Sequence, residues 1–332
     1  MKCWTRRQFI EAAAAGMAAS PLIASGMTST AKSDPRPIVY WTPEISEAAL
    51  IRMVNLVKGE LTGKIALKLH TGEPKGPNIL PPAWIKTLQG TIPESTIVEC
   101  NVLYKSPRQT TAGHRKVLEE NGWTFSKVDI MDEFGDAPLP IKGGLHLKEI
   151  MVGKHFFDYD SMLVLTHFKG HGMGGFGGSL KNIAIGCASA EHGKKQVHNV
   201  QPDGSWPRGA GFMEHMADVG KGIVDHFGRK IAFVNVLRNM SIDCDCAGVA
   251  ASTPTLPDLG IFASTDLVAI DQASIDLVYS LPDWVKHTFV KRVESREGLR
   301  QLSAMKEIGV GTGEYRILQD LLQHAVAVQA GS

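Results

Sequence analysis

The stretch MLVLTHFKGHGMGGFGGSLKN, residues 162–182, decides how this sequence can fold. Its first five residues are a short apolar run, which is typical of a strand that is buried on both faces of a sheet. A loop rich in glycine follows at once, and glycine lets the backbone adopt positive φ angles and approach other groups closely. The stretch therefore predicts a buried strand that ends in a loop built for close contact, either with a ligand or with another part of the chain.

Apolar runs of the same kind alternate with helical periodicity along the chain. The runs at 65–69, 96–103, 125–130, 162–166 and 231–237 predict strands, and the periodic segments at 45–57, 111–121, 145–157, 212–227 and 266–279 predict helices. This alternation predicts an α/β fold with a mostly parallel sheet flanked by helices and the glycine-rich loop at a strand end. Ligands bind at the carboxyl ends of strands in such sheets, so the site is expected there. The remainder from residue 282 is expected to be helical.

The first thirty residues have the pattern of a targeting segment. TRRQFI at residues 5–10 matches the twin-arginine consensus, and the apolar run at 12–23 is shorter than the ~20 residues of a membrane span. Small residues at 29–31 favour cleavage, so we expect a signal peptide over 1–31 and a single domain over 32–332. The segment predicts passage through the twin-arginine export machinery to the periplasm, with no stable membrane span after cleavage. An uncleaved anchor is the alternative.

The overall charge excludes some partners. The chain of 332 residues has a net charge of +1, and its lysines and arginines are spread evenly. A protein that binds nucleic acid or an anionic membrane surface needs a concentrated basic region. We therefore expect a small-molecule substrate or a redox partner, and no nucleic acid.

Histidines and a lysine gather around the glycine-rich loop. Four histidines lie within 32 residues, and one lysine follows the last glycines: His167, His171, His192, His198 and Lys181. Histidine serves as metal ligand or as acid and base near neutral pH, and a lysine in a desolvated pocket can act as a nucleophile or attachment point. The glycines expected to lie against a cofactor are Gly174, Gly175, Gly177 and Gly178. The loop also matches the dinucleotide fingerprint formally, but it lacks the acidic residue expected about 20 positions later.

Cysteines form the second candidate group. Cys244 and Cys246 are separated by one residue, and Cys187 follows the glycine-rich loop. A disulfide between Cys244 and Cys246 would be strained, and the cysteine spacing does not fit a bacterial ferredoxin. Two thiolates side by side favour nickel, zinc or iron. The alternative is that both are small buried apolar residues.

Several motifs together resemble one family. The sequence resembles the domain of unknown function 362 family in KLHTGE at 68–73, TTAGH at 110–114, the loop at 167–189, CDC at 244–246 and ASTDLVAID at 263–271. Members of that family are often described as iron–sulfur centre proteins, because many carry an inserted ferredoxin cassette. This chain has no such cassette between residues 195 and 231.

The loop and the histidine after it are also similar to the nickel-pincer lactate racemase family. In that family a lysine at this place is joined to a nicotinate-derived pincer cofactor, a later histidine ligates nickel, and two histidines act as acid and base. The resemblance implies that Lys181 is the tether, His198 is the metal ligand, and His171 and His114 are the acid–base pair. The arginine that precedes the lysine in those racemases is Leu180 here.

These patterns give one expected function and one alternative. The first is a metal-cofactor enzyme of racemase or epimerase type, or an oxidoreductase, that acts on a small hydroxy acid. The alternative is a non-catalytic metal or iron–sulfur protein that uses Cys187, Cys244 and Cys246 with a histidine. A third option, a carbohydrate- or peptide-binding module, has little support because aromatic residues make up only 7% of the chain.

Overall fold

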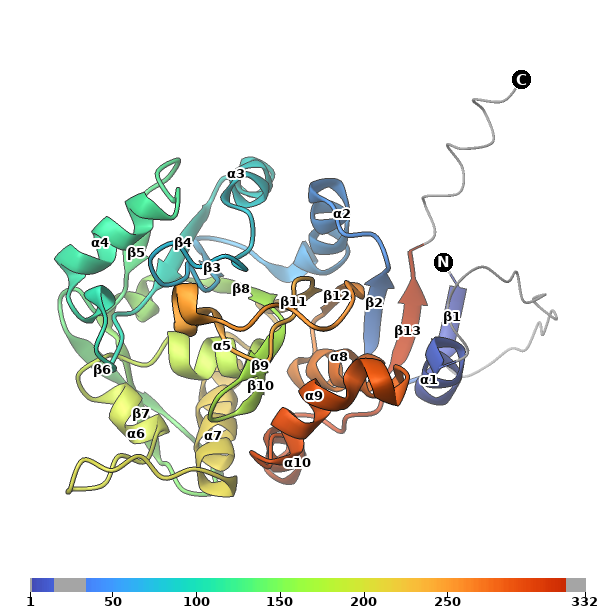
Figure 1. Ribbon diagram of the computed structural model, residues 1–332. Coiled ribbons are helices and arrows are strands. Elements are labelled where there is room, and N and C mark those ends of the chain that lie inside the picture. Colours follow the sequence, from blue (N-terminus) through green and yellow to red (C-terminus); the bar gives the residue numbers. More distant parts are fainter. Residues whose placement is uncertain (1, 15–33, 321–332) are drawn as a thin grey trace.

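A mixed nine-stranded sheet forms the centre of the described part of the chain, residues 2–14 and 34–320 of a computed structural model (Figure 1). The strands lie in the order β1-β13-β2-β12-β11-β8-β3-β4-β5. Their bounds are Lys2–Thr5, Arg316–Gln319, Ile38–Thr42, Gly260–Ser264, Ile231–Leu237, Ser161–His167, Ile65–Lys68, Ser95–Glu99 and Asp129–Ile130. Five of the eight neighbouring pairs are parallel, including the whole block from β11 to β5. The sheet confirms the predicted mostly parallel α/β fold.

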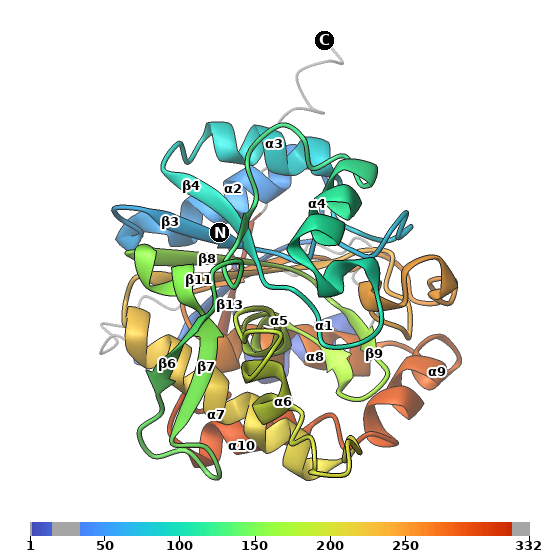
Figure 2. The ribbon, with the colours of Figure 1, turned by 90° about the vertical axis from the view of Figure 1, so that its left-hand side faces the viewer.

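Helices cover both faces of this sheet (Figures 1 and 2). One face carries α2 (Glu47–Val57) and α3 (Pro82–Gly90), and the other carries α5 (Ser179–Gly186), α7 (Ala210–Phe227) and α8 (Leu267–Ser280). Side chains of a strand point alternately to the two faces. In β8, Leu163 and Leu165 therefore belong to one core, and Met162 and Val164 belong to the other.

Shorter elements complete the structure. They are α1 (Arg6–Ala14), α4 (Thr111–Glu120), α6 (Gly193–Val197), α9 (Asp283–Glu294), α10 (Arg300–Glu307), the ribbon of β6 (Asp136–Pro140) and β7 (Glu149–Gly153), and the ribbon of β9 (Lys169–His171) and β10 (Gly175–Gly177). Four 3-10 turns lie between them in the described residues, of which η4 (Asp245–Ala250) matters for the site. No helix in the described residues is both long and apolar enough to span a membrane.

Two predicted elements are wrong. The segment 145–157 contains β7 and a 3-10 turn where a helix was expected, because β7 pairs with β6 and buries Ile150 and Val152, two residues apart, against the core. The end of the chain is not all helical, since β13 runs beside β2 as a strand. The expected strand at 96–103 ends at Glu99, and its last residues form a loop at the sheet edge.

Residues 2–14, the start of the predicted signal peptide, pack against the sheet as β1 and α1. β1 pairs with β13, and Figure 1 shows both elements at one end of the molecule. Phe9 is 1% exposed, with its ring centroid 5.5 Å from that of Trp41 and 6.0 Å from that of Phe262. Arg6 donates to both carboxylate oxygens of Asp276, at 2.7 and 3.1 Å. The predicted cleavage point, near residue 32, lies outside the described residues.

Candidate functional site

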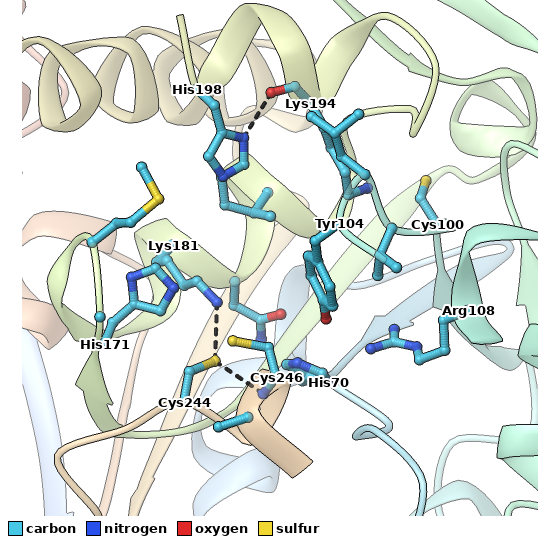
Figure 3. A pocket seen from close by; sticks show the side chains of 18 of the residues that line it. His70, Cys100, Tyr104, Arg108, His171, Lys181, Lys194, His198, Cys244 and Cys246 are labelled. Carbon is cyan, nitrogen blue, oxygen red and sulfur yellow. Dashed lines mark hydrogen bonds between the residues drawn. The ribbon is translucent and has the colours of Figure 1, made fainter. Parts of the chain in front are cut away.

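A cavity of about 410 Å³ opens at the carboxyl ends of β3, β4, β8 and β11 (Figure 3). His70 follows β3, Cys100 follows β4, His171 lies in the ribbon after β8, and Cys244 follows β11. Parallel strands bring their carboxyl ends to one edge, which explains why segments so far apart in sequence meet here. The cavity confirms the expectation that a pocket forms at this edge.

The position of α5 is fixed by a carboxylate from a different helix. Asp271 in α8 accepts the backbone N–H groups of Ser179, at 2.8 Å, and Leu180, at 2.9 Å, which are the first residues of α5. A Cβ atom at Gly178 would lie 2.5 Å from the Asp271 Oδ1 atom, so only glycine permits this close approach. The contact places Lys181 in the first turn of α5, and its side chain reaches the cavity.

The glycines predicted to contact a cofactor lie outside the lining of the cavity. Gly174, Gly175, Gly177 and Gly178 are not among the residues that line the cavity. Gly175 has a φ of +76°, and a Cβ there would lie 2.9 Å from the Cα of Gly298. Gly175 and Gly178 thus allow close packing against α9 and α8, and the contact of all four glycines with a cofactor stays a prediction.

Lys181 lies beside the two neighbouring cysteines. Its Nζ atom donates to the Cys244 Sγ atom at 3.3 Å, and the Cys246 N–H donates to the same sulfur at 3.5 Å (Figure 3). The hydrogen bond from the Cys246 side chain and the positive charge of Lys181 lower the pKa of Cys244 well below its usual range, against the effect of burial. Burial alone would lower the pKa of Lys181, but the negative sulfur raises it. Both pKa directions favour an ammonium group at Lys181 paired with a thiolate at Cys244.

Three side chains here are close enough to share a metal ion. The ligand atoms of His171, Cys244 and Cys246 lie within 4.8 Å of one another. The His171 Nδ1 atom already accepts the Gly174 N–H at 2.7 Å, so the neutral ring carries its proton on Nε2. Burial and Lys181 lower the pKa of His171 to about 3, which keeps the ring neutral. The two sulfurs are therefore the stronger ligands, and His171 ligates only after this hydrogen bond or its Nε2 proton is lost.

His198 lines the opposite wall of the cavity and lies outside that group. Its Nδ1 atom lies 2.7 Å from the Lys194 carbonyl oxygen and donates to it, so Nε2 is left as an acceptor. The ring stacks on Phe212, with centroids 5.0 Å apart, and contacts Trp206 at 4.7 Å. Burial lowers the pKa of His198 to about 4, so the imidazole is neutral near pH 7.

His114 and Cys187 do not line the cavity. The His114 Nε2 atom accepts from Arg108 Nε at 3.1 Å, and its Nδ1 atom bonds Asn101 at 3.2 Å, so both ring nitrogens are engaged. Burial and the charge of Arg108 lower the pKa of His114 well below its usual value. Cys187 is fully buried, and burial raises its pKa to about 12. Neither residue meets a ligand in the cavity as arranged, and their predicted roles gain no support from their positions.

The other two histidines near the loop have structural partners. His167 lies 3.0 Å from both carboxylate oxygens of Asp245 and 2.7 Å from the Arg238 carbonyl oxygen. The Lys169 Nζ atom pairs with the same carboxylate at 2.9 Å. Asp245 thereby joins the turn with Cys244 and Cys246 to the end of β8. His192 is exposed and bonds Asp136.

A buried charge network forms the third wall and was missed from the sequence. Glu99 pairs with Lys68 and with Arg108, each at 3.0 Å, and Arg108 also pairs with Glu73 at 3.2 Å. Burial alone would raise the pKa of Glu99, but Lys68 and Arg108 lower it well below its usual range. Further cavity residues without a predicted role are His70, Tyr104, Lys194 and Trp206. His70 lies in the family motif at 68–73, and the other three carried no signal in the sequence.

Comparison with known proteins identifies the family of this chain. A family model described as "Domain of unknown function (DUF362)" matches residues 65–276. The chain belongs to the DUF362 family. The matched segment contains every residue that lines the cavity and leaves out residues 2–14 and the last helices. No match was found among curated proteins.

Two solved structures are similar to this chain at low identity. One is the lactate racemase apoprotein from Thermoanaerobacterium thermosaccharolyticum, with 12% identity and a TM-score of 0.39 over 71% of this chain and 56% of that one. The other is a protein from Thermotoga maritima, with 12% identity and a TM-score of 0.43 over 72% of this chain and 59% of that one. The DUF362 chain thus spans less than two thirds of the length of both.

Proposed function

We propose that this DUF362 protein is a metal-dependent isomerase, of racemase or epimerase type, that acts on a small hydroxy acid. The observation that carries the proposal is the meeting of Lys181, His171, His198 and the thiol pair around one cavity. A deep pocket with a few convergent polar groups and shifted pKa values is the usual form of an active site. We further propose export through the twin-arginine route, on the strength of the motif at 5–10.

The donor set fits a soft or borderline metal. Cys244 and Cys246 would hold the ion and leave its other positions open for a cofactor or a substrate, because His171 keeps its Nδ1 hydrogen bond and its Nε2 proton. Lys181 is positioned to attach a small organic cofactor, as the racemase resemblance implies, once its contact with Cys244 is released. A bound nickel-type group would supply a site that removes hydrogen from a carbon and returns it to either face.

Two histidines divide the proton chemistry in a way that the sequence did not suggest. His171 presents a protonated Nε2, which can donate to a substrate oxygen, and His198 presents an unprotonated Nε2, which can accept the hydroxyl proton. This pair replaces the predicted pair of His171 and His114, because the His114 ring is fully engaged by Arg108 and Asn101. His198 then serves as the base. If a bound cofactor places its metal beside Nε2, the same nitrogen ligates the metal, as the racemase resemblance implies.

The test is metal analysis and intact-mass measurement on protein purified from its native host. We expect near-stoichiometric nickel, iron or zinc in the unmodified protein and loss of at least tenfold in a C244S/C246S double variant. Cys187→Ala is the matched control, because that cysteine is buried away from the cavity. Lys181→Met should remove any covalent mass addition.

The activity is tested separately. Purified protein should interconvert the enantiomers of a 2-hydroxy acid, and chiral chromatography measures this interconversion. Unchanged metal content in the double variant would contradict the proposal.

A second candidate is a metal or iron–sulfur protein without catalysis. The close grouping of His171, Cys244 and Cys246 favours it, since their ligand atoms lie within 4.8 Å of one another. Cys187 would take no part, because it lies outside the group. Visible absorbance separates the two: an iron–sulfur cluster gives a broad band, whereas zinc alone gives none. A metal-loaded protein that racemises no hydroxy acid would favour this candidate.

A further inference from the structure

Two buried ammonium groups of the cavity have no carboxylate partner among the described residues. They are Lys181, which contacts only the Cys244 sulfur, and Lys194, whose Nζ donates to the Ala188 carbonyl oxygen. Every other basic side chain that lines the cavity is paired with a carboxylate, namely Lys68 and Arg108. Lys194 is thus the one cation of this cavity lining that has neither a carboxylate nor a thiolate as partner.

An unpaired charge of this kind is costly. Lys194 is 3% exposed, and a buried ammonium is stabilised only by an opposite charge or by loss of its proton. Burial lowers its pKa, and Cys100, Asp132 and Glu99 oppose this effect only through space. Glu99 is already satisfied by two cations, and the Asp132 oxygens accept N–H groups of Asn101 and Ala190. The protein therefore leaves room for a negative charge from outside the chain.

The surroundings of Lys194 suit a small ligand. Lys194 and His198 lie one turn apart at α6, and both line the cavity, as Figure 3 shows. Trp206 contacts the His198 ring and adds an apolar surface to the lining of the same cavity. A ligand with one anionic end and a short body can thus meet charge and apolar surface at the same wall.

We propose that Lys194 recognises the anionic group, a carboxylate or a phosphate, of the molecule that this cavity binds. The inference rests on the proposed function and deepens it, because it assigns the residue that binds the charged group of the substrate. Lys181 stays beside Cys244, so the two lysines would contact opposite ends of the ligand. A carboxylate and a phosphate offer the same charge-assisted hydrogen bonds, and the experiment distinguishes them.

The experiment is calorimetric titration of the full chain with two probes, L-lactate and inorganic phosphate, at low and constant ionic strength. We expect at least one probe to bind, and Lys194→Met to weaken that binding tenfold or more. Lys194→Arg should stay within about threefold of the unmodified chain, because the charge is kept. The matched control is Lys195→Met, which changes the exposed lysine next to it in α6 and should leave binding unchanged. Binding of lactate alone assigns a carboxylate, and binding of phosphate alone assigns a phosphate.

A second measurement needs no variant. Either bound probe should slow acetylation of Lys194 in the unmodified chain, and acetylation of Lys195 should proceed as before, both read by peptide mass spectrometry. The inference is wrong if neither probe binds the unmodified chain, or if Lys194→Met binds the probe with the same affinity as the unmodified chain. Metal content measured on the same samples separates the two proposals. If the unmodified chain holds metal but anion binding does not depend on Lys194, only this inference is wrong. If anion binding depends on Lys194 but the metal content of C244S/C246S is unchanged, only the metal proposal is wrong.

Discussion

Burial keeps the site histidines neutral, and their hydrogen bonds decide which nitrogen carries the proton. His171 accepts a backbone N–H at Nδ1, whereas His198 donates from Nδ1 to a carbonyl oxygen. The two rings therefore present opposite chemistry to the same cavity. Residue type alone could not separate them, because both appear in the sequence simply as histidines near glycines.

His114 gives a prediction that distinguishes a structural histidine from an acid–base one. Its pKa is held well below the usual value, so on acidification the unfolded chain takes up a proton that the folded chain refuses. Stability should fall as the pH drops below about 6.5, by up to about 1.4 kcal/mol per pH unit for this group. His114→Gln should remove this part of the slope in urea unfolding between pH 6.5 and 5. His287→Gln, on exposed α9, is the control. An unchanged slope in His114→Gln, or lost metal binding, would contradict the structural role.

The sequence predicted part of the site for a physical reason. Lys181, His171 and Cys244 follow predicted buried strands, and the carboxyl ends of such strands meet in a parallel sheet. Arg108 and Lys194 were missed, because a single charged residue in a sequence looks like surface. Arg108 is buried by carboxylates from other segments, and no sequence pattern shows that pairing.

At the scale of elements, the cap of α5 is the contact that holds the site in shape. Asp271 lies in α8 but satisfies the first N–H groups of α5, and the Asn235 amide donates to the same carboxylate at 2.9 Å. Helix starts leave such N–H groups without partners, and a negative charge there is favourable. The cap therefore couples the position of Lys181 to the packing of α8 on the sheet.

Asp271→Asn tests this coupling. The amide has only one acceptor oxygen, so one buried N–H group loses its partner, which costs about 1–3 kcal/mol. We expect a drop of that size in the free energy of unfolding by urea, together with weaker metal retention. Asp283→Asn, at an exposed carboxylate in the first turn of α9, should change stability by less than about 0.5 kcal/mol. Equal effects of the two substitutions would show that the cap is unimportant.

The elements themselves were predictable where one segment decides its own structure. Strand β11 matches its predicted bounds, and α4 ends at Glu120, one residue before the predicted end, with Gly122 at a φ of +83° just beyond. The prediction for β7 was wrong because its strand form depends on pairing with β6. The prediction for β13 was wrong because that strand pairs with β2 and β1. Pairing partners that lie far along the chain decide such short strands, and local periodicity does not report them.

At the scale of the whole molecule, residues 2–14 stabilise the fold. Phe9 is packed between Trp41 and Phe262, so Phe9→Ala should cost about 3–5 kcal/mol. Arg7 is 88% exposed and pairs only with Glu11, so Arg7→Ala should cost less than about 0.5 kcal/mol. Urea unfolding of the full chain measures both. Equal stability of the two variants would mean that α1 does not pack on the sheet in solution.

Arg6 is bound by Asp276, whereas its neighbour Arg7 is largely exposed and pairs only with Glu11, so only one guanidinium group of the motif is accessible in the folded chain. A receptor that must hold both arginines can bind only after β1 has separated from β13 and Phe9 has left its aromatic neighbours. Under the proposed export, recognition of the motif and completion of the sheet edge are competing uses of residues 2–14. That proposal then predicts that a weaker Arg6–Asp276 pair favours export and that a stronger pair opposes it.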